Sequence, residues 1–472
     1  MIFGTFEFFI FLAAVVAAYW FLKPWPIIRK LFLIAASGYY YWLIDSRFAG
    51  LIAMAALATF LLARTVRNDN FIGKGAFLLG IFGNLGILLL FKYYDFFRIS
   101  AQTFLSSIRL TASLPFWEIA FPIGISFYSF RMVSYLIDVR KQKYAAESSV
   151  VDFFAYASFF PYMLAGPIVR ADEFLPQLKN GGPKQPREIN IAATMLFLGL
   201  FKKIIVSSWL AQNLTDNNFS VPEQISAATA WLAALGYTFQ IYCDFSGYSD
   251  IAIAAAMFMG FQLAPNFEYP YRAKSIAEFW RRWHISFYSW MRDYIYIPLG
   301  GNRKGTVRSY LNTIFVFALS GLWHGAAGHY LLWGLWHGIG LCAQRLWQQF
   351  KLNVIIERYN PKIINNILGW FLTFSFVGLG WILFRAENLE RASAFAAALL
   401  KFDSPNTTDS AILLPILLIA IFIIYERKLF QNMVKIQKHL PNILWPLIWI
   451  ILVCAIYYFA PQTIPPFIYF SF

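Results

Sequence analysis

The sequence predicts an all-α membrane protein that crosses the bilayer many times. Residues of the set AVILMFWYC make up 59% of the 472 positions and charged residues 13%, whereas soluble proteins carry about 25% charged residues. The mean hydropathy is +0.55, and Phe, Tyr and Trp together reach 20%. A soluble particle of this size has too little interior to bury so much apolar surface. The same figures exclude a disordered chain and a disulfide-stapled secreted fold.

Charge and cysteine usage agree with this class. The 39 Lys and Arg residues exceed the 24 Asp and Glu residues by 15, and they lie in short gaps between apolar runs, as the positive-inside rule describes. We therefore attribute the surplus to membrane topology and expect no nucleic-acid partner. Cys243, Cys342 and Cys454 lie too far apart in the sequence to form a disulfide framework or a CxxC zinc site.

The first apolar run begins near Phe8 and predicts a retained transmembrane helix. No Lys or Arg precedes it, and it continues through Leu22 past any small-residue cleavage site, which is not the pattern of a cleavable signal. Basic gaps at 23–30 and 64–75 alternate with a neutral gap at 45–47. This alternation predicts an N-terminus outside the cell and both basic gaps in the cytoplasm.

Further apolar runs follow along the chain. Because a spanning helix needs about 20 residues and several runs are shorter, we expect about 10–13 crossings together with re-entrant or interfacial helices. The polar stretch 170–190 predicts an ordered surface loop. A polar break at 403–409 separates a body at 1–400 from peripheral transmembrane helices in 401–472. The runs lie near 31–44, 48–63, 76–91, 119–138, 151–168, 191–210, 225–243, 251–263, 310–323, 330–347, 367–384, 411–425 and 443–460.

Residues 264–308 are too polar to span a membrane and too aromatic for a free loop. Winding 278–294 as one helix, at about 100° per residue, separates two faces. We expect an amphipathic helix that lies at the membrane surface or enters it partway. An arc of about 120° carries Trp280, Trp283, His284, Phe287, Trp290, Met291 and Tyr294, and the other side carries Glu278, Arg281, Arg282, Ser289, Arg292 and Asp293.

Four of the five histidines fall between His284 and His337, in the region richest in tryptophan. An ionisable residue at membrane depth is costly and is a functional candidate by default, and imidazole can transfer protons near neutral pH. His324 ends an apolar run and has glycines on both sides. This setting fits either a catalytic residue or a helix-end histidine bonded to a carbonyl group. His439 lies in a basic gap, where we expect it to be solvated.

Other chemistry has less support from the sequence. The spacing of His324, His329 and His337 does not suit metal ligands on one helix, and no HExxH pattern occurs, so we expect no metal site. Asp244 and Asp250 flank a Gly/Ser break in apolar surroundings. They either orient a histidine or an arginine, or cap a helix.

Six segments of the sequence are distinctive when taken together. They are 278–286 (EFWRRWHIS), 292–303 (RDYIYIPLGGNR), 321–326 (GLWHGA), 121–128 (FPIGISFY), 166–170 (GPIVR) and 380–386 (GWILFRA). With these segments the chain resembles the membrane-bound O-acyltransferase family, most closely its bacterial alginate O-acetylation branch. The resemblance extends from the first helix to about residue 400, and it is more specific than any single short pattern.

The resemblance implies that His324 is the catalytic histidine, that His284 is the second histidine of the family, and that both line a central tunnel. There a cytoplasmic thioester donor, acyl-CoA or an acyl carrier, meets an acceptor from the opposite face, with no permanently bound cofactor. His329 stands where the branch usually has Trp, which leaves its role open. The candidates for donor binding or support are Arg281, Arg282, Trp280, Asp244, Asn302, Arg303 and Trp323.

Basic residues near the second motif have two explanations. Arg281, Arg282, Arg303 and Lys304 suit the phosphates of coenzyme A or of a carrier prosthetic group. Positive-inside anchoring explains the same charges equally well. The sequence alone leaves both open.

The expected function is transfer of an acetyl group from the cytoplasm for O-acetylation of an exported polysaccharide such as alginate. The expected setting is the lipid of a bacterial inner membrane, with an extracytoplasmic acetyl-accepting partner protein and other polysaccharide biosynthesis proteins. One alternative is D-alanyl transfer to teichoic acid from a carrier protein. An alternative of another class is a proton-coupled transporter or flippase, in which intramembrane histidines relay protons.

Overall fold

The computed structural model describes residues 3–110, 114–117, 121–350, 362–402, 410–437, 439, 441 and 444–470, and these residues form helices and no strand. The all-α class is therefore confirmed. The chain divides into two compact units, one of Met1–Ala192 with Ala252–Ala264 and the other of Ala193–Ile251 with Pro265–Phe472.

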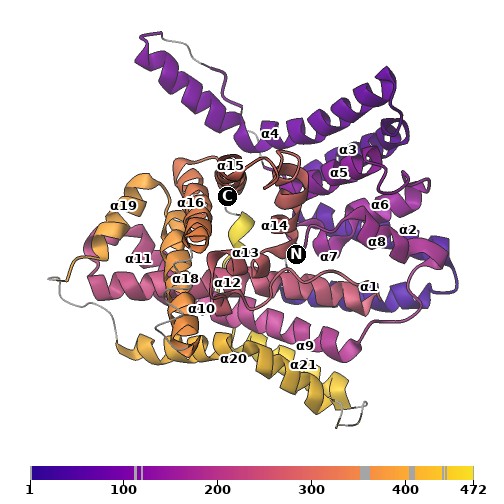
Figure 1. The fold of residues 1–472 in the computed structure, drawn as a ribbon. Helices are drawn as coiled ribbons and strands as arrows, with labels where there is room; N and C mark the ends of the chain where they lie inside the picture. The colour runs from indigo at the N-terminus through magenta and orange to yellow at the C-terminus, as the bar shows by residue number, and fades with distance from the viewer. Residues whose placement is uncertain are drawn as a thin grey trace. The chain divides into compact units, whose positions relative to one another are not determined.

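The first unit is built from the N-terminal helices, drawn in indigo to magenta in Figure 1. Helices α3 and α4 pack closely, and Asn84 of α4 donates to the hydroxyl of Thr59 of α3 at 3.1 Å in the buried interface. The helices are α1 (Phe6–Phe21), α2 (Pro26–Ile44), α3 (Ser46–Val66), α4 (Phe71–Ser107), α5 (Ile125–Arg140), α6 (Val150–Ser158), α7 (Phe160–Met163), α8 (Ala171–Leu178), the 3-10 turn η1 (Lys179–Gly181) and the first residues of α9 (Ile189–Leu200).

The polar stretch 170–190 differs from its prediction. Its first part is helix α8, whose Phe174, Leu175 and Leu178 are buried. The proline and glycine residues that suggested a loop lie mostly after this helix. Pro176 lies inside it, and the apolar face of the short helix outweighs the cost of one proline near its end.

The second unit contains the four buried histidines and is built from the rest of α9 and the helices that follow. They are η2 (Phe201–Ser207), α10 (Ser208–Leu210), η3 (Ala211–Thr215), α11 (Asp216–Ser220), η4 (Pro222–Gln224), α12 (Ala227–Phe258), η5 (Pro270–Arg272), α13 (Ile276–Arg282), α14 (Ile285–Met291), η6 (Arg292–Tyr296), α15 (Thr306–His324), α16 (Gly328–Gln349), α18 (Lys362–Arg385), α19 (Leu389–Ala398), η7 (Ser410–Ile412), α20 (Leu413–Gln437), α21 (Trp445–Tyr458) and η9 (Ile468–Phe470). Of these, η2, η3 and η6 are π-helical. The last turns of α12, from Ala252 on, belong to the first unit.

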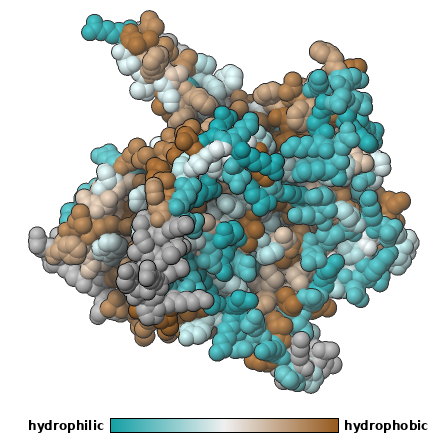
Figure 2. All heavy atoms as spheres, in the orientation of Figure 1, coloured by the Kyte–Doolittle hydropathy of each residue, from teal (hydrophilic) through white to brown (hydrophobic). Residues whose placement is uncertain are grey.

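Four described helical stretches are long and apolar enough to cross a membrane, namely Ser46–Val66, Phe71–Ser107, Ile189–Ser220 and Ile363–Arg385. Large hydrophobic side chains such as Phe82 and Phe97 project from α4, and hydrophobic atoms cover much of that helix in Figure 2. The protein is thus a multi-pass membrane protein. The count of about 10–13 crossings, the re-entrant segments and the sidedness of the N-terminus stay predictions.

The sequence predicts one continuous amphipathic helix over 278–294. The prediction of a continuous helix is wrong, but the face predicted to be apolar is buried. The chain leaves the helix after Arg282 and starts α14 at Ile285, and η6 follows α14. All seven residues of the aromatic arc are nevertheless buried. Helical periodicity survives the break because each short helix keeps its apolar side toward the interior.

Helices α20 and α21 follow residues 403–409, where the sequence predicts a polar break that lies outside the described residues. The division into a body at 1–400 and peripheral transmembrane helices in 401–472 stays a prediction. His439 is exposed, in agreement with a solvated histidine.

Candidate active site

His324 is the last residue of α15, where close packing against α16 fixes its position. Its side chain is buried. A Cβ at Gly321 would lie 2.1 Å from the carbonyl oxygen of Tyr330, and one at Gly325 would lie 2.1 Å from the Tyr330 ring. The glycines on both sides of His324 therefore let α16 approach the end of α15.

His284 lies at the break between α13 and α14, and Asn266 holds its ring. Its φ is 44°, in the left-handed region that is uncommon outside glycine. Nδ1 of His284 lies 3.2 Å from Oδ1 of Asn266, which also accepts from the backbone N–H of Ser286 at 3.2 Å. A backbone N–H can only donate, so this atom is the amide oxygen. Nδ1 of His284 therefore carries the proton, and Nε2 carries the lone pair.

The environment of His284 keeps the imidazole uncharged. Its side chain is buried, and burial lowers the pKa of His284, because a charged ring is costly away from water. A residue held in a sparsely populated backbone conformation often marks a functional site. His284 combines this conformation with a defined tautomer and a neutral, proton-accepting Nε2.

Three aromatic rings contact both histidines. The centroid of Phe287 lies 5.0 Å from that of His284 and 5.8 Å from that of His324. The corresponding distances are 6.2 and 4.7 Å for Trp323, and 6.3 and 5.3 Å for Tyr469. Two imidazoles 40 positions apart in the sequence thus share one aromatic environment. We call this group the histidine cluster, with the members Phe245, Trp280, His284, Phe287, Trp323, His324, Trp333, His337, Phe384 and Tyr469.

Residues 380–385 of α18 face His324, His329 and His337. A Cβ at Gly380 would lie 3.2 Å from Nε2 of His337, and Phe384 lies 5.0 Å from His324, centroid to centroid. His329 donates from Nδ1 to the carbonyl oxygen of Leu383 at 3.0 Å. His329 therefore joins α16 to α18, which gives a structural role to the histidine whose role the sequence left open.

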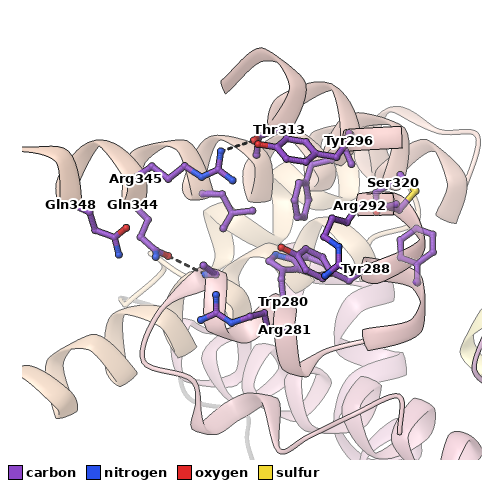
Figure 3. A pocket seen from close by; sticks show the side chains of 16 residues that line it. Trp280, Arg281, Tyr288, Arg292, Tyr296, Thr313, Ser320, Gln344, Arg345 and Gln348 are labelled. Carbon is purple, nitrogen blue, oxygen red and sulfur yellow. Dashed lines mark hydrogen bonds between the residues drawn. The ribbon is translucent and has the colours of Figure 1, made fainter. Parts of the chain in front are cut away.

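A cavity of about 300 Å³ adjoins the histidine cluster, and Phe287 and Trp280 belong to both. Three guanidinium groups line it, those of Arg281, Arg292 and Arg345 (Figure 3). Its lining contains no carboxylate, although Arg292 also pairs with Asp293 at 2.7 Å. Arg345 is held by hydrogen bonds to the hydroxyls of Ser309 and Thr313, at 3.1 and 3.0 Å. The other lining residues are Ala277, Tyr288, Met291, Tyr296, Thr313, Val316, Phe317, Ser320, Leu341, Gln344 and Gln348.

The remaining candidates from the sequence are distributed differently. Trp323 is buried and contacts both histidines, whereas Arg282 pairs with Glu278 at 2.8 Å and does not line the cavity. Asn302 and Arg303 are exposed on the turn before α15. The structure therefore brings Trp280, Arg281 and Trp323 to the histidines and the cavity, and it leaves Arg282, Asn302 and Arg303 away from them.

Asp244 and Asp250 face lysines, not a histidine or an arginine, and they lie within α12, where neither caps a helix. Asp244 accepts from Lys203 and, at 2.9 Å, from the backbone N–H of Ile468. Asp250 lies 2.7 Å from Lys202. Asp244 thus holds the C-terminal segment in place through Ile468, and the next residue, Tyr469, belongs to the histidine cluster. We call Lys202, Lys203, Asp244, Asp250 and Glu426 the lysine–carboxylate cluster.

Sequence reasoning missed three residues of this site. Asn266 and Arg345 lie outside the recognised segments, and Tyr469 lies beyond residue 400, where the resemblance ends. Only Arg345 had a local signal, because it is a basic residue near the end of an apolar helix. The described residues contain no group of three or more His, Cys, Asp or Glu side chains placed to hold a metal ion.

Comparison with known proteins identifies the family. The model of the membrane-bound O-acyltransferase family matches residues 77–384. The chain is 34% identical over 475 residues to a probable alginate O-acetylase of Pseudomonas putida, which covers 94% of each chain. It is 33% identical over 395 residues to a peptidoglycan O-acetyltransferase of Helicobacter pylori, which covers 78% of this chain and 73% of that one.

A more distant relative is named for the transfer of a different acyl group, D-alanyl. The teichoic acid D-alanyltransferase of Streptococcus thermophilus is 28% identical over 285 residues, which covers 56% of this chain and 68% of that one. All of these relatives transfer acyl groups by name, which favours an enzyme over the transporter alternative. The family match covers both histidines, the cavity and segment 380–384. The chain therefore belongs to the membrane-bound O-acyltransferase family and is an O-acyltransferase.

Proposed function

We propose that the protein transfers an acetyl group from a cytoplasmic thioester to a hydroxyl acceptor, for O-acetylation of an exported polysaccharide such as alginate. The observation that carries this proposal is the sharing of Phe287, Trp323 and Tyr469 by His284 and His324, beside a cavity lined by arginines. Two relatives named above are O-acetyl-transferring proteins, one for alginate and one for peptidoglycan, which supports acetyl as the acyl group.

The cavity suits an anionic donor. Guanidinium groups recognise phosphate through paired hydrogen bonds, and three of them line the cavity without a carboxylate among the lining residues. Coenzyme A and a carrier-bound phosphopantetheine share this phosphate chemistry. We assign Arg281, Arg292 and Arg345 to the phosphates of such a donor, and Trp280 to the wall along its thiol-bearing arm.

The two histidines suit the transfer step. The acceptor hydroxyl attacks the thioester carbonyl carbon, so that a C–O bond forms and the C–S bond breaks. His324 takes the proton from the hydroxyl and returns it to the departing thiolate, which is general acid–base catalysis by one group. His284 presents the lone pair of Nε2 and accepts a hydrogen bond from the incoming hydroxyl, which orients it for attack.

The family resemblance supports a proposal for the setting of the reaction. We propose that the protein lies in the inner membrane of a bacterium and that the acetyl group passes to a separate extracytoplasmic partner, which works with the polysaccharide biosynthesis proteins. Lipid surrounds the apolar helices. The donor is a substrate, and no cofactor stays bound.

The test is transfer of radiolabelled acetyl from acetyl-CoA by the purified protein in lipid vesicles. His324→Ala is expected to abolish transfer, His284→Ala to weaken it, and the exposed His439→Ala to leave it unchanged. Equal transfer by the wild type and His324→Ala would overturn the proposal. A second arm offers D-alanyl carrier protein, because the streptococcal relative is a D-alanyltransferase; faster transfer from that donor would favour the alternative acyl group.

A further inference from the structure

One stripe of α15 runs along the cavity and ends at His324. Thr313, Val316, Phe317 and Ser320 all line the cavity, and their spacing of three and four residues places them on one helix face. His324 follows Ser320 by four residues and continues this stripe. One helical turn, about 6 Å along the axis, separates the two residues. Ser320 is thus the polar residue of the cavity wall nearest to His324 along α15.

The hydroxyl of Ser320 makes no hydrogen bond to the backbone of its own helix, α15. Ser320 is 2% exposed, and its Oγ has no hydrogen-bond partner among the described residues. Serine and threonine within helices commonly donate to the carbonyl four residues earlier, as Thr313 does to Ser309 at 2.8 Å. A buried polar group without a partner is costly and rare in native proteins. A ligand bound in the cavity would therefore supply the hydrogen-bond partner that the hydroxyl of Ser320 lacks among the described residues.

Trp280 is the second such group on the cavity wall. It is also 2% exposed, and its indole Nε1 has no hydrogen-bond partner among the residues that the structure describes. Buried tryptophans usually find an acceptor, and in this chain even the exposed Trp336 donates to the carbonyl oxygen of Phe376, at 3.0 Å. Both orphan groups, an O–H and an N–H, are hydrogen-bond donors. They therefore match a ligand that offers a hydrogen-bond acceptor.

We propose that Ser320 and Trp280 bind the thioester carbonyl oxygen of the acyl donor. This inference rests on the proposed function and adds the residues that hold the reacting group. When the acceptor hydroxyl attacks, negative charge develops on that oxygen, and the two donors stabilise it before the C–S bond breaks. Neutral His284 cannot do this, because its proton is directed to Asn266. Donors placed where charge develops in the transition state are a major source of catalysis.

The test compares Ser320→Ala with Ser320→Thr in the acetyl-transfer assay. Loss of one such donor lowers kcat by about 100-fold, so we expect that loss for Ser320→Ala, with an unchanged KM for acetyl-CoA. Ser320→Thr keeps the hydroxyl and is expected to recover most of the rate. Trp280→Phe keeps a ring and removes the N–H, and it is expected to lower kcat in the same way. Ser289→Ala is the control, because that hydroxyl already donates to Ser286 within α14.

The outcomes separate this inference from the function on which it rests. Wild-type transfer that depends on His324, with Ser320→Ala as fast as the wild type, would overturn the inference alone. Equal losses in Ser320→Ala and Ser320→Thr would also overturn it, because they would show a packing effect. Binding of free coenzyme A, which has no acyl carbonyl, is expected to be the same in Ser320→Ala and wild type. Absence of His324-dependent transfer in the wild type would overturn the proposed function and this inference with it.

Discussion

The second unit buries polar groups in two contrasting ways. The histidine cluster places imidazoles among aromatic rings, and in it Trp333 contacts both His324 and His337, at centroid distances of 4.9 and 5.0 Å. The lysine–carboxylate cluster buries full charges in pairs. Lys202 lies 2.7 Å from both Asp250 and Glu426, and Tyr242 donates to Glu426 at 2.6 Å.

The two clusters therefore suit different roles: the lysine–carboxylate cluster suits a structural role, and the histidine cluster suits a catalytic one. A buried charge is tolerated only when it is paired and hydrogen-bonded. The charged side chains of the lysine–carboxylate cluster must therefore stay paired with one another. A neutral imidazole can be buried among rings and still exchange a proton during a reaction. Glu426 also shows that α20, predicted as peripheral, contributes a buried charge partner to Lys202.

The largest expected effect on stability comes from breaking the charged cluster. Lys202→Met leaves Asp250 and Glu426 without their shared cation, and we expect a loss of about 3–5 kcal/mol in the free energy of unfolding. His337→Phe exchanges one buried neutral ring for another, so it is expected to cost less than about 1.5 kcal/mol. Denaturant titration in detergent measures both, and equal losses would refute the contrast between the clusters.

Asn266→Ala is expected to lower kcat by about 100-fold, because a misplaced catalytic group costs roughly that factor. Without the amide oxygen, the tautomer and ring orientation of His284 are no longer fixed. The KM for the donor is expected to stay unchanged, since Asn266 does not line the cavity. A change in KM with a normal kcat would place Asn266 in donor binding instead.

Arg345→Gln is expected to raise the KM for acetyl-CoA about 10-fold with kcat unchanged, because a hydrogen bond to a charged group contributes about 1.5–3 kcal/mol. Arg282→Gln is the matched control, since Arg282 pairs with Glu278 and lies off the cavity. Initial rates against donor concentration separate KM from kcat. Similar changes in both variants would argue against a donor site at this cavity.

The smallest effect is expected at Asn302, which the sequence placed among the supporting residues. Asn302 is exposed on the turn before α15. Asn302→Ala is therefore expected to keep kcat within about twofold of the wild type and the free energy of unfolding within about 0.5 kcal/mol of it. Transfer assays and unfolding measurements check this. A loss of tenfold or more would restore Asn302 to the site.

Much of the site could be predicted from local sequence. Helical periodicity placed the seven aromatic-arc residues on one face, and all seven are buried. The resemblance paired His284 with His324, and the structure brings them to the same three rings. The break at His284 could not be predicted, because Asn266 and the backbone N–H of Ser286 hold it in a conformation that its own side chain does not favour.

The sequence by itself determined the all-α membrane class, the apolar helices and the two histidine segments. Composition and periodicity are local properties, and they decide which stretches become helices and which face is buried. Only the tertiary structure decided that Asn266 orients His284, that Arg345 reaches the cavity and that Glu426 pairs with Lys202. These contacts join residues 18 positions apart (Asn266 and His284), 32 apart (Arg345 and Thr313) and 224 apart (Glu426 and Lys202). No local pattern specifies which polar group a buried polar group will contact.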